Sequence, residues 1–431
     1  MLRVIAIILT GIITSFYFFP FEFSFLPGAN TKMLMAGFSL VVLMIQLAKK
    51  GQGNINKDFF LLSLWAITVS LAGIVSVTYN GTNDYSYASY IISMWVWLGG
   101  AYIVINSVRW VHGIVSVRLV LNYLIFVCVC QCIVALLIDA YVPIKELVHT
   151  YVKGFDWVEF DQLEKGGRLY GVGATLDVAG LRFAAVLVGI ACLLTQSDVR
   201  ANNLKMILYL IAFFVIVIIG NMMSRSTMVG VLLSIVYWTF LFIKNGKHKK
   251  ILKWLVITGG VAVIFSIYLY NTNVIFKSNI RFAFEGFFSL WEKGEWLVSS
   301  NDILRKMYIF PDNLKTWIIG DGYFENPYYT DPNYIGPRTG GYYMNTDVGY
   351  LRFIFYSGII GLGLFIAFFI KSTEACIKRF IRYKVLFLML LAVNFICWFK
   401  VSTDIFLVFA LFLCISKDEN EEYENSLKQI Q

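Results

Sequence analysis

Two segments of the sequence place arginine where it could bind an anionic group. In the segment from Gly166 to Arg182, glycines surround Arg168, and a helix is predicted to begin near Asp177. Glycine lets backbone amides approach a ligand closely, a helix N-terminus favours an anion, and the forked donors of Arg168 and Arg182 match phosphate oxygens. The glycine spacing is neither a Walker nor a Rossmann pattern, so an ordinary loop-to-helix transition is the alternative.

The second such segment is a short predicted turn between two apolar stretches, residues 221–227, which carries Arg225 between two serines. Charge at membrane depth is costly and commonly marks a pathway or an anion site. The alternative is an arginine that reaches toward lipid headgroups.

Aromatic residues gather further along the chain, after amphipathic segments that carry Arg305. Tyrosine rings on a loop can stack on sugars while their hydroxyls form hydrogen bonds, although they could instead anchor the protein at the membrane interface. This stretch also contains Arg338. It ends at Asp347 and Arg352, which flank a predicted spanning helix and could form a structural ion pair. The tyrosines that could bind a glycan are Tyr323, Tyr328, Tyr329, Tyr334, Tyr342 and Tyr343.

The composition predicts that membrane-spanning helices position these side chains. The chain has 431 residues, of which 58% are hydrophobic and 15% are charged, and its mean hydropathy is +0.70. Soluble globular proteins are about 45–50% apolar and roughly 25% charged. We therefore expect an all-α integral membrane protein with about twelve transmembrane helices. The expected spans are Val4–Phe19, Met33–Ala48, Phe59–Thr78, Tyr87–Asn106, Leu119–Val142, Leu181–Gln196, Met206–Gly220, Met228–Ile243, Ile251–Tyr270, Val348–Ile370, Val385–Phe399 and Ile405–Ile415.

The distribution of charge predicts the topology. Although the net charge is +9, lysine and arginine fall mainly in short runs between apolar segments, as in cytoplasmic loops, so nucleic acid is not an expected partner. With both termini cytoplasmic, residues 1–431 form a single polytopic membrane domain. Its expected features are two long outside loops, 143–180 and 271–346, with short amphipathic helices, and an acidic cytoplasmic tail, 417–431.

Several motifs in this order resemble the O-antigen polymerase and O-antigen ligase family of bacterial membrane glycosyltransferases. They are Gly-Arg-Leu-Tyr-Gly (167–171), Met-Ser-Arg-Ser (223–226), Gly-Asp-Gly (320–322), Asp-Val-Gly-Tyr-Leu-Arg (347–352) and Ser-Gly-Ile-Ile-Gly (357–361). The predicted helices and paired outside loops agree with the family, so the resemblance covers nearly the whole chain.

The resemblance implies an inverting glycosyltransferase of the bacterial cytoplasmic (inner) membrane that joins glycan units carried on undecaprenyl diphosphate. Neither long loop contains an Asp-x-Asp motif, so we expect no metal and no cofactor. Arginines would hold the leaving diphosphate instead. The expected set is Arg168 and Arg225, with Arg182, Arg305 or Arg338 as further members.

One departure from the family favours a polymerase over a ligase. The ligase branch has a histidine near the end of the second long loop, where this chain has Asp347; the three histidines are His112, His149 and His248. Asp347 is the expected general base, and Glu159 and Asp161 are alternatives.

The main hypothesis is therefore a polymerase of a surface polysaccharide such as O-antigen, capsule or exopolysaccharide. Its expected partners are an undecaprenyl-diphosphate-linked oligosaccharide, the lipid bilayer and a chain-length regulator. A ligase that transfers finished glycan to another acceptor is the alternative within the enzyme class. A lipid-linked oligosaccharide flippase or another carrier is the alternative from a different class, although carriers concentrate polar residues at the bilayer midplane and have short loops.

Overall fold

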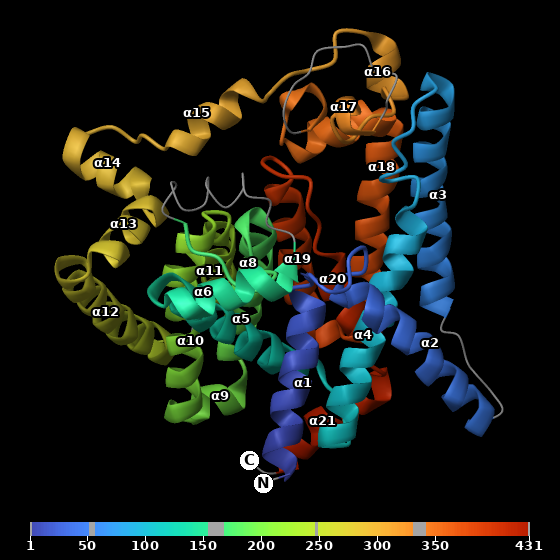
Figure 1. Cartoon of the computed structure of the whole chain (residues 1–431). Helices are drawn as coiled ribbons and strands as arrows, with labels where there is room; N and C mark the ends of the chain where they lie inside the picture. The colour runs from blue at the N-terminus through green and yellow to red at the C-terminus, as the bar shows by residue number, and fades with distance from the viewer. Residues whose placement is uncertain (1, 51–56, 154–167, 246–248, 331–341, 430–431) are drawn as a thin grey trace.

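A computed structural model describes residues 2–50, 57–153, 168–245, 249–330 and 342–429, and this part of the chain is almost entirely helical (Figure 1). Eight helices are long and apolar enough to cross a membrane. This supports a membrane-embedded helical protein. The eight helices are α2 (Thr31–Lys50), α3 (Lys57–Asn80), α4 (Tyr90–His112), α5 (Val117–Ala140), α8 (Leu176–Leu194), α10 (Asn203–Met223), α12 (Lys249–Thr272) and α18 (Gly349–Arg379).

The other four predicted spans coincide with helices that are shorter or only partly described. Of these, α19 and α20 are separated by an irregular segment, residues 398–405, where the expected spans Val385–Phe399 and Ile405–Ile415 also leave a break. The amide of Ile405 in this segment bonds to the side chain of Asn394 in α19, at 3.1 Å. The four helices are α1 (Leu2–Phe18), α11 (Thr227–Asn245), α19 (Lys384–Cys397) and α20 (Phe406–Leu413).

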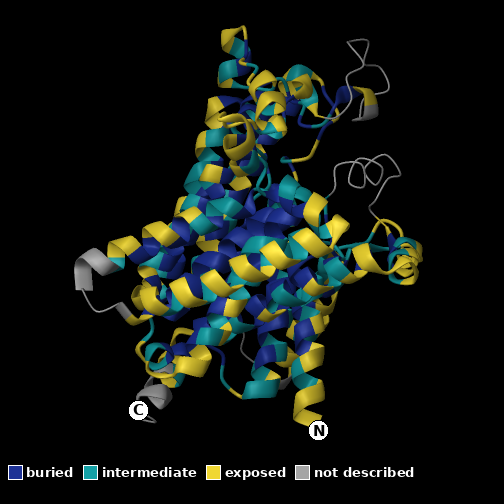
Figure 2. Ribbon diagram, turned by 90° about the vertical axis from the view of Figure 1, so that its left-hand side faces the viewer, coloured by how far each residue is buried: buried dark blue, intermediate teal, exposed yellow. Residues whose placement is uncertain are grey.

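Helix α8 is the most enclosed of the eight and lies at the centre of the buried core, which Figure 2 shows in dark blue. It packs against α11, α10, α19 and α5. A side chain at Gly230 of α11 would collide with the backbone of Ala184, so this glycine lets α11 approach α8 closely. Because α8 is fixed on several sides, the first turn that follows Thr175 is held in a defined position.

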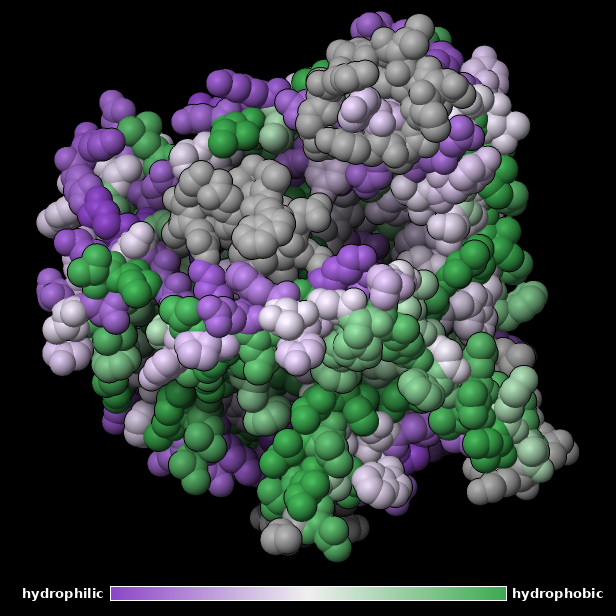
Figure 3. Space-filling view, in the orientation of Figure 1, coloured by the Kyte–Doolittle hydropathy of each residue, from purple (hydrophilic) through white to green (hydrophobic). Residues whose placement is uncertain are grey.

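The two chain termini lie at one end of the helical bundle, and the helices of the second predicted outside segment lie at the other end, which we call the loop end (Figure 1). Hydrophobic residues dominate the surface below the loop end, and hydrophilic residues gather over α14 and α15 (Figure 3). The helices of this segment are α13 (Val274–Ala283), α14 (Glu285–Lys293), α15 (Ser299–Lys306), α16 (Leu314–Ile318) and α17 (Pro327–Thr330), followed by the 3-10 turn η1 (Tyr343–Asn345).

The first predicted outside segment, 143–180, contains most of helix α6 (Val142–Tyr151) and the first turn of α8. The chain leaving α1 forms β1 (Glu22–Phe23), and the chain leaving α6 forms β2 (Val152–Lys153). These two strands pair antiparallel, with Glu22 opposite Lys153. The small sheet therefore ties α6 to the end of α1.

The acidic tail is helical and begins against the bundle. Helix α21 (Lys417–Gln429) places the Glu419 carboxylate on both Nε and Nη2 of Arg109, at 2.7 and 3.0 Å. The amide of Val117 donates to the side chain of Asn420 at 3.0 Å. Two short helices complete the described chain, α9 (Ser197–Ala201) and the 3-10 turn η2 (Ile381–Tyr383).

Candidate functional site

Arg168 and Arg225 lie together at the loop end, on one aromatic ring. Their guanidinium carbons are 4.8 and 4.2 Å from the centre of the Phe282 ring. The sequence predicted both arginines as diphosphate-binding residues, although they are 57 residues apart and no motif links them. The ring contacts keep two like charges near each other in a partly desolvated place.

Backbone contacts bring the two arginines together. The amide of Leu169 donates to the carbonyl of Met222 at 3.1 Å, which joins the glycine-rich segment to the turn between α10 and α11. Arg225 also donates from Nε to the carbonyl of Phe282 at 2.9 Å, and from Nη1 to the hydroxyl of Ser300 at 2.9 Å. Three parts of the chain thus meet at one point.

The two arginines differ in their pairing. Arg225 forms an ion pair with Glu285 at 2.6 Å, whereas Arg168 has no carboxylate within 4 Å among the described residues. Burial lowers the pKa of both guanidinium groups; Asp177 opposes this shift at Arg168, and Glu285 opposes it at Arg225. Arginine stays protonated at neutral pH despite such shifts, so Arg168 is a charged group with unused donors.

Beside Arg225 is an open cavity of about 380 Å³. Its wall includes three basic side chains, Arg225, Arg281 and Lys293, and two acidic ones, Glu285 and Glu292. The carboxylate of Glu292 is bidentate on Arg281, with both distances 2.7 Å. The cavity wall is therefore polar and carries a small excess of positive charge.

A second, apolar cavity of about 600 Å³ lies between α10 and α12 and is also lined by residues of α5 and α13. Ile207 and Ile219 both line it, and twelve helical residues span about 18 Å. Asn279 of α13 lines the cavity one helical turn before Phe282. One residue of the cavity wall therefore lies about one helical turn from Phe282, whose ring carries the two arginines.

Next to the arginines, Asp177 in the first turn of α8 gathers a group of polar side chains. Its carboxylate accepts hydrogen bonds from Ser224 at 3.1 Å and Ser226 at 2.5 Å, and pairs with Lys400 at 2.8 Å. The helix begins at Leu176, close to the predicted start at Asp177. Lys400 comes from the irregular segment after α19, and no sequence signal had marked it.

Asp347 lies beyond this group, just before α18. It is partly buried, and within the described chain no cation lies within 4 Å of its carboxylate. Burial raises the pKa of Asp347; Arg352 and Lys400 oppose the shift, and Asp177 adds to it. Asp347 thus interacts electrostatically with the polar group around Asp177, which in turn interacts with Arg168.

Arg352 is surrounded by aromatic rings and hydrogen-bond acceptors, and it is only 4% exposed. Its guanidinium carbon is 3.3 Å from the centre of the Tyr342 ring and 3.7 Å from that of Phe324. It donates to Ser402 at 2.7 Å and to Glu325 at 3.2 Å. Its ion pair is with Glu325 rather than with Asp347, the partner considered from the sequence.

Two of the family-like motifs contact each other at the kink of α18, where Ser357 and Gly358 depart from helical geometry. The amide of Asp321 donates to Phe355 at 2.6 Å, and the amide of Gly322 donates to Tyr356 at 3.1 Å. The Gly-Asp-Gly and Ser-Gly-Ile-Ile-Gly segments are therefore packed against each other. This packing gives both motifs a structural role.

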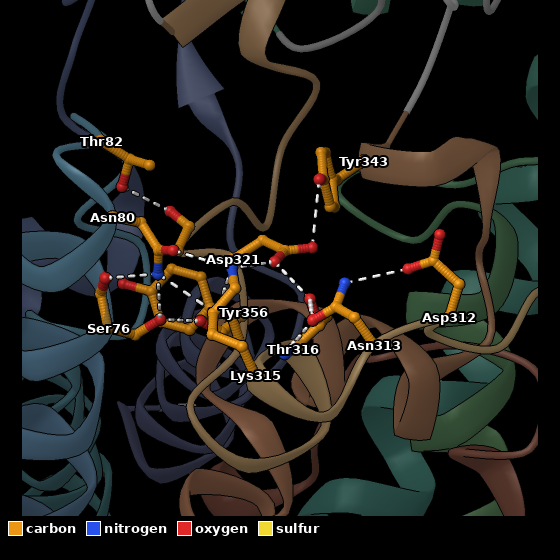
Figure 4. A network of polar contacts seen from close by, with 12 residues as sticks. Ser76, Asn80, Thr82, Asp312, Asn313, Lys315, Thr316, Asp321, Tyr343 and Tyr356 are labelled. Atoms are coloured by element: carbon orange, nitrogen blue, oxygen red, sulfur yellow. Dashed lines mark hydrogen bonds and ion pairs between the residues drawn. The ribbon is translucent and has the colours of Figure 1, made fainter.

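The network in Figure 4 fixes this contact. The carboxylate of Asp321 accepts from Lys315 at 2.5 Å, from Thr316 at 2.6 Å and from the Tyr343 hydroxyl at 3.2 Å. Asn80 of α3 donates to the carbonyl of Gly320 at 3.1 Å. The Tyr343 hydroxyl is therefore bonded to the Gly-Asp-Gly segment through Asp321.

The remaining predicted diphosphate-binding residues lie elsewhere. Arg182 is enclosed within the bundle beside Phe19, at 5.5 Å. Arg305 is on α15 with 84% of its side chain exposed, and its nearest carboxylate is that of Asp302 at 4.0 Å. Arg338 lies outside the described residues, as do the alternative bases Glu159 and Asp161.

The predicted glycan-binding tyrosines are partly described. Tyr323 and Tyr343 have ring centres 5.4 Å apart, Tyr342 covers Arg352, and Tyr328 is 44% exposed on α17. Tyr334 and the side chain of Tyr329 lie outside the described part of the chain. His149, the histidine of the first predicted outside segment, lies 3.1 Å from the Tyr170 hydroxyl.

Sequence reasoning missed residues that act through tertiary contacts. Asp84, between α3 and α4, accepts hydrogen bonds from the amides of Phe324 and Glu325 at 2.7 and 2.8 Å and so anchors the loop beneath Arg352. Neither Lys400 nor Glu325 belongs to a recognisable motif, so only the structure shows which residues they contact. Among the described residues, no three histidine, cysteine or carboxylate side chains gather as a metal site would require.

No protein-family model, no curated protein and no solved structure matches this chain.

Proposed function

We propose that this protein is a polymerase of a bacterial surface polysaccharide. It would transfer glycan from undecaprenyl diphosphate onto the next lipid-linked repeat unit by metal-independent, inverting glycosyl transfer at the outer face of the cytoplasmic membrane. The observation that carries the proposal is the pair Arg168 and Arg225 on Phe282 of α13, next to an apolar cavity that is lined by α13 and by the sparsely buried helix α12.

The donor would bind with its diphosphate at the arginines and its isoprenoid tail in the apolar cavity. Arg168 offers donors that no described carboxylate uses, and Arg225 is positioned by Phe282, Ser300 and Glu285. Bidentate guanidinium–phosphate bonds strengthen as charge develops on the leaving oxygen, so they stabilise the transition state more than the ground state.

The acceptor would react on the side of Asp347. Its hydroxyl oxygen forms a bond to the anomeric carbon while the bond from that carbon to the diphosphate breaks, and the diphosphate leaves with the electron pair. The hydroxyl proton passes to the Asp347 carboxylate, whose pKa is raised by burial, which makes it a better base than an ordinary aspartate. The tyrosines around Arg352 would contact the sugars.

Deleting the gene and analysing surface glycan length tests the proposal. Complementation would use Arg168→Ala, Arg225→Ala and Asp347→Asn variants that reach the membrane at normal levels. A polymerase predicts that the deletion and the variants leave single repeat units on the surface acceptor, without a ladder. Accumulated long glycan on the lipid carrier would indicate a ligase, and repeat units trapped facing the cytoplasm would indicate a flippase. Normal ladders from all three variants would refute the site.

A further inference from the structure

Helix α14 turns its large apolar side chains away from the rest of the protein. Phe287, Leu290 and Trp291 are spaced three and four residues apart, which places them on one side of the helix. They are 56%, 49% and 89% exposed. An amphipathic helix in a soluble protein turns such a face toward the core. We call these three residues the apolar face of α14, and its direction indicates an apolar environment outside the chain.

The other side of α14 is polar and is bound to the protein. Its Glu285 carboxylate pairs with Arg225 at 2.6 Å. Its Glu292 carboxylate is bidentate on Arg281 of α13, with both distances 2.7 Å. Both glutamates belong to the wall of the polar cavity beside Arg225. A rotation of α14 that buried Trp291 would break both ion pairs, so these contacts fix the outward direction of the apolar face.

The composition of α12 indicates where the bilayer lies beside this helix. From Trp254 to Tyr270 the chain has no charged residue, and this length of helix spans about 24 Å, close to a hydrocarbon core of roughly 30 Å. The apolar side chains of α12 are largely exposed. Because tryptophan and tyrosine gather at both membrane interfaces, Tyr270 marks the interface at the loop end.

Helices α13 and α14 are attached to this tyrosine. The Phe288 ring of α14 stacks on the Tyr270 ring, with the ring centres 5.8 Å apart. Arg281 of α13 donates from Nη1 to the Tyr270 hydroxyl at 3.0 Å. Phe288 directly follows Phe287 in the chain. The apolar face of α14 therefore begins beside the point where α12 leaves the hydrocarbon core, and it continues the exposed apolar surface of α12.

We infer that α14 docks its apolar face onto phospholipid, in the bilayer leaflet at the loop end. Phe287, Leu290 and Trp291 lie about 5–10 Å deep, at the boundary between headgroups and acyl chains, as in other interfacial helices. Tryptophan suits this depth because its ring is apolar while its N–H group can bond to water or headgroups. Since Glu285 on the polar side holds Arg225, docking also keeps this arginine near the level of the headgroups. The inference does not depend on the proposed polymerase activity.

Spin labels test this docking in the purified full chain, reconstituted in phosphatidylcholine nanodiscs without substrate. One nitroxide is attached to the Trp291→Cys protein, and another to the Asp302→Cys protein, where the aspartate side chain on α15 is 65% exposed. The native cysteines are buried or partly buried, and the wild-type chain labelled in parallel gives their background. Collision rates are measured with O2, which concentrates among acyl chains, and with a neutral nickel chelate, which stays in water.

We expect the ratio of O2 collisions to nickel collisions to be at least about threefold higher at position 291 than at position 302, because only the first lies among acyl chains. Leu290→Cys, on the same face, should give the same result and replaces Trp291→Cys if that variant does not fold. Frequent nickel collisions at position 291 would place the face in water. Low rates with both reagents would show that protein, such as a second copy of the chain, covers it. Either result would overturn the inference.

Discussion

Arg168 and Arg225 contact the same Phe282 ring, but only Arg225 forms an ion pair with a described carboxylate. This difference predicts unequal roles in the reaction. Arg225 is already bound to Glu285, whereas no described carboxylate pairs with Arg168. We expect Arg168→Gln to lower kcat about 100- to 1,000-fold, as expected on removing a donor to a developing charge, and Arg225→Gln to lower it only about tenfold. Single-turnover rates with a lipid-linked donor measure both. Equal losses would show that Glu285 does not restrain Arg225 during the reaction.

The base predicted at Asp347 gives the reaction a pH dependence with a definite sign. Burial raises the pKa of this carboxyl, and activity should be lost as the pH falls through that value because the base becomes protonated. The positive charge of Lys400 opposes the shift, so Lys400→Gln should move this acidic limb to higher pH. A pH–rate profile of kcat checks the shift, with Lys277→Gln, at an exposed position on α13, as the control. A limb that stays in place, or moves to lower pH, would contradict the assignment of Asp347.

At the scale of elements, the kink in α18 holds the Gly-Asp-Gly segment in position. Gly358 has a φ of +68°, and a Cβ there would collide with the Ile318 carbonyl. Gly358→Ala should therefore lower the free energy of unfolding by at least roughly 1–3 kcal/mol. Gly363→Ala in the same helix is the matched control, because a Cβ there meets nothing within 4 Å. Thermal unfolding in detergent compares the two, and equal midpoints would show that the kink is not required for stability.

The apolar cavity between α10 and α12 predicts a dependence on tail length. Ile218 lines it, so Ile218→Trp should obstruct the isoprenoid and raise the donor KM about tenfold, or about 1.4 kcal/mol. A donor with a much shorter prenyl chain should be little affected. Leu232→Trp, on the exposed face of α11, is the control. If both donors lose affinity equally, the cavity does not hold the tail.

Local sequence patterns were sufficient for some elements and not for others. The sequence predicted a turn at residues 221–227 between two apolar stretches, and α10 ends at Met223 while α11 begins at Thr227. The expected spans left a break after Phe399, but nothing in the sequence showed that Lys400 in this break pairs with Asp177 or that the amide of Ile405 bonds to Asn394. Long-range pairing leaves no periodic signal in a single sequence.

The same reason limits what the sequence reveals about the site. Arg168 and Arg225 stood out because glycines and serines surround them, and the structure brings these two together. The sequence marked Arg182 as a candidate in the same way, yet its side chain is buried inside the bundle. The direction of this side chain depends on how α8 packs. Glycine-rich context indicates a close approach of the backbone, but only tertiary packing decides which way a helical side chain points.

At the scale of the whole molecule, the fold separates an apolar bundle from a polar end. Both chain termini lie opposite the loop end (Figure 1). The arginine pair contacts Phe282 of α13, and the serines on either side of Arg225 donate to Asp177. The apolar cavity lies between α10 and α12 and is also lined by residues of α13. Such an arrangement suits a substrate with a long apolar tail, a charged diphosphate and a hydrophilic glycan.

The most direct test of the central claim is reconstitution of the purified chain in lipid nanodiscs with defined undecaprenyl-diphosphate-linked repeat units. We expect a ladder of longer lipid-linked glycans, with one undecaprenyl diphosphate released for each bond formed, and no ladder with the Asp347→Asn protein. If the wild-type chain binds these units and leaves them at single length, the proposed polymerase activity is contradicted.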